Sequence, residues 1–223
     1  MGSARLLTGA VCLRVARTVL GIGAILVAYS CESSTPLPHR GQQVRAVCPS
    51  AGDDDFFFPE ETLSPGNATR DYERRLALSS YLTAAGVASL SCGAGEDGYR
   101  LIWGGGYNDP LLVVTVSGRT VAATEFVPSN IAKRSVKNAS SRTITRAQFD
   151  DVASQIESAD FWTADAVRVF ESEGTGWVFE GRRGTSYRAI TRTHPDQRLA
   201  KVARVLVELS ELSVPSRMSI QEK

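Results

Sequence analysis

The stretch from Leu111 to Val127, LLVVTVSGRTVAATEFV, decides the fold class of this 223-residue chain. Leu111 to Val116 is a continuous run rich in β-branched residues, Ser117-Gly118 is a turn signal, and Thr120 to Val127 is a second strand-like run. The stretch therefore predicts a β-hairpin. A further strand-like run from Tyr99 to Trp103 precedes it, so we expect an antiparallel meander of three strands.

A second hairpin is predicted over about Glu173 to Arg192, with Gly181 to Gly184 as its turn. If Glu180 lies opposite Thr185, then Glu173 lies opposite Arg192. In that register one face carries Trp177, Phe179 and Ile190, and the other carries Val178, Glu180, Tyr187 and Ala189. A slip of one residue would exchange the two faces.

Three helices complete the predicted secondary structure. Apolar periodicity predicts a helix from about Arg70 to Ala85, capped by Asn67 or Thr69 and ended by Gly86. Thr145-Arg146-Ala147-Gln148 matches a capping box and predicts a helix to about Ala159. The last helix is predicted from near Pro195 to Leu212. Because helices and strands with one apolar face need a partner, we expect an α+β fold: a five- or six-stranded, mostly antiparallel sheet with helices packed on one face.

Three other segments are predicted to be less regular. Val87 to Cys92 favours a short strand, and Pro128 to Arg142 favours a loop. The basic residues of that loop, which are either solvated or in contact with anionic lipid headgroups, are Lys133, Arg134, Lys137 and Arg142. In the run Asp53 to Phe58, DDDFFF, we expect the phenylalanines to pack on the domain while the aspartates stay in solvent.

Residues 1–30 have the features of an export signal. They contain Arg5, Arg14 and Arg17 and no acidic residue. The uncharged run from Thr18 to Ser30 has 13 residues, whereas a membrane-spanning helix needs roughly 20. The run fits the roughly 7–15-residue apolar core of a signal peptide. A small residue followed by Cys31 resembles the lipobox of bacterial lipoproteins, which implies that Cys31 is lipidated and becomes the mature N-terminus. Plain secretion and a retained N-terminal anchor are the alternatives.

Cysteine usage agrees with export. If Cys31 is lipidated, Cys48 and Cys92 remain as an even pair in an oxidising compartment. A disulfide between them would close a loop of 45 residues, and chain entropy would then stabilise the fold by about 4 kcal/mol. The alternative is two unpaired thiols. Two distant cysteines and two histidines do not make a metal site, so no metal or other cofactor is expected.

Composition and charge limit the remaining classes. The chain is 43% hydrophobic, enough for a core, and its prolines favour a flexible tether over residues 31–67. A single domain over 68–212 and a disordered tail over 213–223 follow. Loss of residues 1–30 removes three arginines and no acid, which changes the formal net charge from +1 to −2. A nucleic acid partner is not expected, because it would need a strongly basic face.

The candidate functional residues are Glu180, Arg192 and His194. The sequence contains no G-x-S-x-G, H-E-x-x-H or C-x-x-C pattern. Glu180 is an acid within an aromatic strand, where a pair with an arginine is the common alternative to a functional role. His194 stands beside Pro195 at a helix start, where capping or simple exposure is the alternative.

A pattern of aromatic residues in the C-terminal third carries a resemblance. It consists of Phe161-Trp162, Trp177-Val178-Phe179-Glu180-Gly181, and then Tyr187, Arg192 and Pro195. Over about Thr143 to Leu212 it is similar to a family of uncharacterised bacterial envelope proteins. The chain departs from that family at Gly174-Thr175-Gly176, where the family has Asp-Gly, and at Thr193-His194, where it has Trp-Ser. The resemblance implies an envelope location and a fold, and no activity.

These features predict an exported, lipid-anchored envelope protein, attached to membrane lipid through Cys31. Its domain is expected to be a non-enzymatic binding module for an envelope protein or a cell-wall partner. An exposed aromatic patch around Tyr99 and Tyr187 would favour this function. The alternative is a small envelope hydrolase that uses Glu180 or His194 and needs a cleft. An inhibitor or a folding accessory is a third hypothesis.

Overall fold

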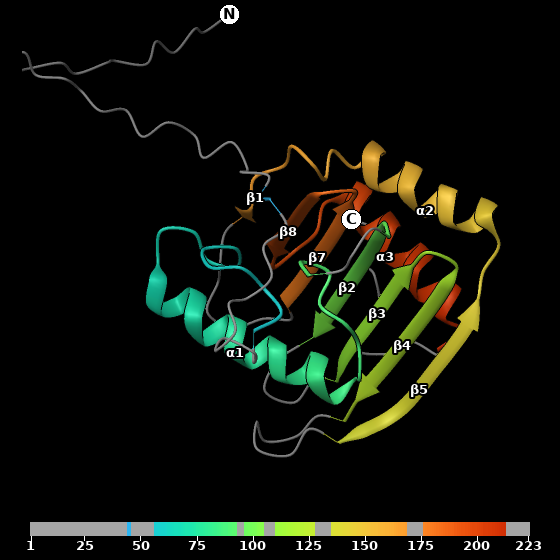
Figure 1. The fold of residues 1–223 in the computed structure, drawn as a ribbon, viewed down its shortest axis with the longest axis horizontal. Helices are drawn as coiled ribbons and strands as arrows, with labels where there is room; N and C mark the ends of the chain where they lie inside the picture. The colour runs from blue at the N-terminus through green and yellow to red at the C-terminus, as the bar shows by residue number, and fades with distance from the viewer. Residues whose placement is uncertain are drawn as a thin grey trace, which may run out of the picture. The chain divides into compact units, whose positions relative to one another are not determined.

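The centre of the structure is one mostly antiparallel sheet. The computed structural model describes residues 44–45, 56–92, 96–104, 110–127, 135–168 and 176–212, all within one compact unit of residues 36–223. The strands are β1 (Val44–Arg45), β2 (Gly98–Gly104), β3 (Leu111–Ser117), β4 (Thr120–Phe126), β5 (Val136–Thr143), β6 (Val167–Arg168), β7 (Gly176–Arg183) and β8 (Ser186–Arg192). Their order is β1-β8-β7-β2-β3-β4-β5, and the two-residue strand β6 pairs with β8 in parallel (Figure 1).

The first predicted hairpin is confirmed. β3 and β4 pair from Leu111 opposite Phe126 to Ser117 opposite Thr120. The turn contains Gly118 with a φ of 54°, a left-handed conformation that glycine adopts without a steric penalty. β2 pairs antiparallel with β3, so the predicted meander is present.

The second hairpin is present, but its predicted register is wrong. Glu180 lies opposite Ala189 rather than Thr185, and Arg192 lies opposite Trp177 rather than Glu173. The turn is tighter than expected because β7 continues to Arg183. The partner on β8 is displaced by four residues. Since four is an even number, each side chain keeps the face that was predicted for it.

Two other predictions of secondary structure are wrong. Within the segment expected to be a loop, residues 136–143 form β5, the last strand of the sheet. Its side chains are polar and largely exposed, so it lacks the apolar run that identified the other strands. Lys137 and Arg142 lie on it, each in an ion pair, while Lys133 and Arg134 lie outside the described residues. Residues 87–92 form an irregular segment and a turn rather than a strand.

The three helices lie where the sequence predicts them, and their ends differ from the predicted ones by two residues or fewer. They are α1 (Ala68–Ala84), α2 (Arg146–Ser158) and α3 (Gln197–Ser210). The side chain of Asn67 accepts a hydrogen bond from the amide of Arg70 and caps α1. Thr145 and Gln148 form the predicted capping box of α2. Asp196 caps α3 by accepting from two amides of its first turn.

The sheet is covered on both faces, as Figure 1 shows. The two late helices pack on one face, as predicted, around a core that includes Leu101, Val114, Phe179, Val202 and Leu206. α1 and the segment before it cover the other face, where Leu82 and Phe58 meet side chains of β2, β3, β7 and β8. Burial on both faces explains why β2 and β3 read as continuous apolar runs rather than as alternating ones.

The domain begins earlier than the predicted boundary at residue 68. Phe58 and Leu63 are 0% exposed, in agreement with the expectation that the phenylalanine run packs on the domain. The carboxylate of Asp71 accepts hydrogen bonds from the amides of Glu61, Leu63 and Ser64 at 2.8 to 2.9 Å. The buried face of α1 is therefore partly polar, because its side chains form hydrogen bonds with the backbone of the preceding segment, which has no regular secondary structure of its own.

None of the helices in the described ranges has both the length and the hydropathy of a membrane-spanning helix. The run from Thr18 to Ser30, on which the export prediction rests, lies outside these ranges, as do Cys31 and Cys48.

Gly181 tests the packing of the α2 side of the sheet. A Cβ at this position would lie 2.6 Å from Cε1 of Phe161, which is 0% exposed. We expect Gly181→Ala to lower the free energy of unfolding by about 1–3 kcal/mol, the usual effect of overpacking a core. Urea denaturation measures this change. The matched control is Gly176→Ala on the same strand, whose added Cβ would have its nearest neighbour at 3.7 Å. Equal midpoints for the two variants would contradict the packing argument.

Candidate functional site

Glu180 lies in a closed cluster of polar side chains on the face of the sheet that α1 covers. Its Oε2 accepts from Nη1 of Arg100 at 3.0 Å, and its Oε1 accepts from the hydroxyl of Tyr187 at 2.8 Å. Arg100 also donates to the hydroxyl of Thr115 and to the backbone carbonyl of Ala88. The side chains of Arg100 and Glu180 are both 0% exposed. The pair with an arginine that the sequence left open for Glu180 is therefore present.

Burial dominates the electrostatics of this cluster. It raises the pKa of Glu180, while the charge of Arg100 and the hydrogen bonds from Tyr187 and Arg100 act in the opposite direction. Burial and the neighbouring carboxylate also raise the pKa of Tyr187 well above its usual value. A group shut away from solvent in this manner stabilises the interior and does not meet a substrate.

Arg192 lies on the opposite face of the sheet from Glu180. Its guanidinium donates to the backbone carbonyls of Asp165 at 2.7 Å and Thr191 at 2.8 Å, and to that of Ala166 at 3.4 Å. Arg192 is 3% exposed. It helps to hold the strap of residues 163–166 against β8, as does the hydrogen bond from the Thr191 amide to the Ala166 carbonyl. Glu180 and Arg192 thus do not form one site.

His194 is exposed in the turn between β8 and α3. An exposed aromatic patch around Tyr99 and Tyr187, which would have favoured a binding module, is absent, because these residues are 2% and 0% exposed and lie in the two different cores. The most exposed aromatic side chain in the described ranges is that of Tyr72 on α1, at 51%.

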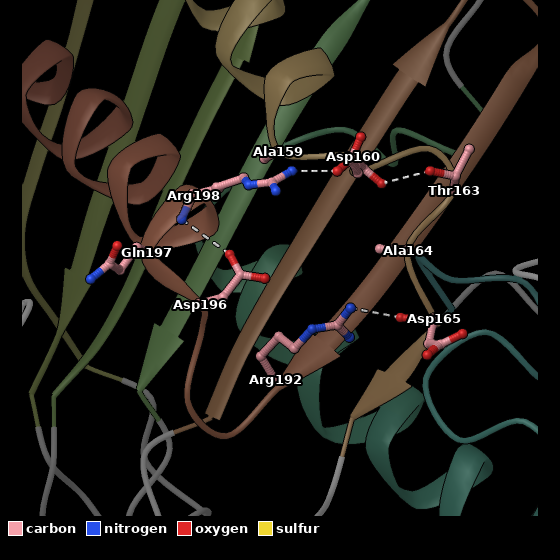
Figure 2. Close-up of a pocket in the computed structure, with 9 residues that line it drawn as sticks. All are labelled: Ala159, Asp160, Thr163, Ala164, Asp165, Arg192, Asp196, Gln197 and Arg198. Carbon is pink, nitrogen blue, oxygen red and sulfur yellow. Dashed lines mark hydrogen bonds and ion pairs between the residues drawn. The ribbon is translucent and has the colours of Figure 1, made fainter. Parts of the chain in front are cut away.

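A cavity of about 660 Å³ opens where the end of α2, the strap and the start of α3 meet. Its lining residues are Ala159, Asp160, Thr163, Ala164, Asp165, Arg192, Asp196, Gln197 and Arg198 (Figure 2). Of the three candidate functional residues, Arg192 is the one that lines it. The cavity is therefore the candidate binding site of this domain.

Asp160 is held in position by its own backbone. It has a φ of 52°, an uncommon conformation for a residue other than glycine that aspartate tolerates better than most. Its carbonyl accepts from the amides of Thr163 and Ala164 and from the hydroxyl of Thr163. This turn directs the carboxylate toward Arg198, with which it forms an ion pair across the mouth of the cavity (Figure 2).

The start of α3 supplies the facing wall. Oδ1 of Asp196 accepts from the amides of Arg198 and Leu199 at 3.1 and 3.0 Å. In Figure 2 the other carboxylate oxygen of Asp196 points away from the helix and into the space above Arg192. The cavity thus has charges of both signs: carboxylates at Asp160 and Asp196, and guanidinium groups at Arg192 and Arg198.

Sequence reasoning missed three residues here and one elsewhere. Asp160 and Arg198 gave no signal, because they become neighbours only when the ends of α2 and α3 meet. Asp196 did carry one, since an aspartate just before a periodic run is a preferred helix cap. Arg100, a single charge in the apolar run from Tyr99 to Trp103, could have suggested a buried partner for Glu180.

Of the two cysteines predicted to form a disulfide, Cys92 lies within the described residues. Cys92 is half-buried and lies close enough to Tyr187 to affect its pKa. Its disulfide with Cys48 stays a prediction. Across the described parts of the chain, no three histidine, cysteine or acidic side chains gather in a geometry that could hold a metal ion.

No protein-family model matches the chain, and a search of the curated proteins finds no match either. The resemblance to bacterial envelope proteins therefore stays a prediction from the sequence.

The pair Arg100 and Glu180 can be tested by a double-mutant cycle. Arg100→Met or Glu180→Leu alone leaves one buried charge without its partner, so we expect each to lower the free energy of unfolding by about 3–5 kcal/mol. The double variant should lose clearly less than the sum, with a coupling of about 2 kcal/mol or more. Urea denaturation provides the measurement. The exposed pair Arg146 and Asp150 is the control, for which removal of both partners should change stability by under about 1 kcal/mol. Additive effects at Arg100 and Glu180 would show that the pair is not coupled.

Proposed function

We propose that this protein is an exported, lipid-anchored envelope protein whose domain binds a partner at the cavity between α2 and α3 without catalysing a reaction. The observation that carries the binding role is the cavity itself, with charges of both signs on its walls. Ligand sites usually have volumes of about 300–1,000 Å³ and a mostly apolar lining with a few polar groups. This cavity has the volume but a mainly polar lining, which suits a charged ligand.

The hydrolase hypothesis loses support from the position of Glu180. A catalytic carboxylate must reach the substrate, and this one is buried in a pair with Arg100 on the face away from the cavity. Within the cavity, Thr163 uses its hydroxyl to donate to the backbone carbonyl of Asp160. That proton is held by a backbone carbonyl, which is not a general base, so the contact gives no support for a nucleophilic role of Thr163.

The binding role is tested by site-specific photo-crosslinking in intact cells of the source organism. Gln197 is exposed and lines the cavity, so a photoreactive residue there should form a crosslinked product with an envelope protein or with cell-wall material. The control position is Asp151, which is exposed on α2 and does not line the cavity. We expect a several-fold stronger product from position 197. Equal labelling at the two positions, or none at position 197, would contradict a partner at this cavity.

Export and anchoring are tested on the mature N-terminus. Mass spectrometry of the protein extracted from native membranes should find residues 1–30 removed and a diacylglycerol group on Cys31. Cys31→Ser should release the protein from the membrane fraction. An intact Met1 would overturn the export proposal, and an unmodified Cys31 after cleavage would leave plain secretion.

The same spectra, recorded without reduction, test the disulfide. β1 places Val44 opposite Tyr187, and Cys92 is close enough to Tyr187 to affect its pKa. Cys48 follows Arg45 by three residues, a span of at most about 11 Å. This placement supports a bridge between Cys48 and Cys92, which we expect as a linked pair of peptides. Two reduced thiols would contradict the assignment to an oxidising compartment.

A further inference from the structure

We propose that the cavity between α2 and α3 binds a small zwitterion, namely the ammonium and carboxylate groups of a free amino acid or of a short unblocked peptide. The inference rests on the proposed binding function and specifies the chemistry of its ligand. The argument starts from the arrangement of charge around the cavity rather than from its volume.

Acidic and basic side chains lie side by side on the wall: Asp160 is paired with Arg198, and Asp196 stands two residues before Arg198 at the start of α3. The carboxylate of Asp160 and the outer carboxylate oxygen of Asp196 are available to accept from an ammonium group (Figure 2). The guanidinium group of Arg198 at the mouth supplies positive charge for a carboxylate, while that of Arg192 at the floor already donates to three backbone carbonyls. A ligand with one charge of each sign is complementary to this arrangement, whereas a ligand with a single charge is repelled by the lining residues of the same sign.

The ion pair at the mouth is easily exchanged. The side chains of Asp160 and Arg198 are 66% and 65% exposed, and a pair this exposed contributes little to stability. A zwitterion can insert between them, so that its ammonium replaces Arg198 at Asp160 and its carboxylate replaces Asp160 at Arg198. Both protein charges remain paired after the exchange, which avoids the large cost of an unpaired charge.

Two other ligand classes fit less well. A simple anion such as phosphate would seek the free amides at the start of α3, but Asp196 already occupies the amides of Arg198 and Leu199. The three acids of the lining outnumber its two arginines, which also disfavours an anion. A divalent cation needs several converging oxygen ligands, and no such group occurs in the described ranges.

The apolar part of the lining limits the ligand's side chain. Ala159 and Ala164 are the apolar residues of the cavity. In the view of Figure 2, Ala164 stands between the ion pair at the mouth and the guanidinium of Arg192. A small side chain such as a methyl group fits against such a surface. L-Alanine and L-alanyl-L-alanine are therefore the probes that the cavity favours.

The test is an NMR titration of the purified mature protein with these two probes, followed through the backbone amide signals. We expect shifts at residues 159–165 and 192–199 that saturate by about 20 mM, as for a Kd near or below about 1 mM. N-acetylation or C-terminal amidation of the dipeptide should raise the Kd at least tenfold. The relative affinity of the free amino acid and the dipeptide identifies the source of the zwitterion.

Two variants test which side chain of the cavity binds each charge of the ligand, and a third is the control. Asp196→Asn keeps a good helix cap and removes the negative charge, so it should weaken binding of the ammonium group severalfold without unfolding α3. Arg198→Gln should weaken binding of both probes and have little further effect on the amidated dipeptide, which lacks the carboxylate. Asp150→Asn removes an exposed acid from the other end of α2 and should leave the Kd unchanged.

Each contrary outcome overturns the inference. Absence of shifts at about 20 mM would show that the cavity binds no such zwitterion. Equal affinity for the blocked and unblocked dipeptides would show that the two charges do not matter. Shifts of the same amides by inorganic phosphate alone would assign an anion site instead. If crosslinking at position 197 succeeds while the titration fails, the binding function stands and only this ligand class is wrong.

Discussion

The pair between Arg100 and Glu180 lies in the junction of β2 and β7, which no hairpin turn determines. β2 and β7 are neighbours in the sheet, but 71 residues separate Gly104 at the end of β2 from Gly176 at the start of β7. Arg100 lies directly opposite Glu180 in this junction. A slip of β7 by one residue would turn Glu180 toward the other core, where Phe179 now packs, and would leave Arg100 without its partner. The desolvation of two charges is tolerable only in this register, so the pair acts mainly as a determinant of register.

Two stacked aromatic rings support the same register from the other face. Trp103 and Trp177 are opposite each other, with ring centroids 4.3 Å apart. The junction thus combines a polar requirement on the α1 side with a shape requirement on the α2 and α3 side. Once β2 and β7 are aligned, β3, β4 and β8 follow through short turns, and the apolar faces that the helices cover are defined.

Local signals in the sequence predicted what local geometry determines. The Ser117-Gly118 turn and the capping box at Thr145 were read correctly, because each depends on a few adjacent residues. The register of the second hairpin is predicted wrongly, because the sequence pattern places Gly181 in the turn. In the structure Gly181 is a strand residue that leaves room for Phe161. β5 was missed because an edge strand with polar side chains carries no apolar pattern. Pairings between distant segments, such as Arg100 with Glu180 or Asp160 with Arg198, depend on the assembled sheet and could not be derived from spacing.

The two faces of the sheet have different roles. On the α1 face, Asp71, Arg75 and Ser79 are buried against the segment that begins at Phe56, so this face fastens the N-terminal part of the domain. The cavity opens on the opposite face, at the meeting point of α2 and α3. The segment that begins at Phe56 and the cavity therefore lie on opposite faces of the sheet. Binding at the cavity then needs no rearrangement of the buried cluster at Glu180, because the side chains that would exchange partners, Asp160 and Arg198, are the exposed ones.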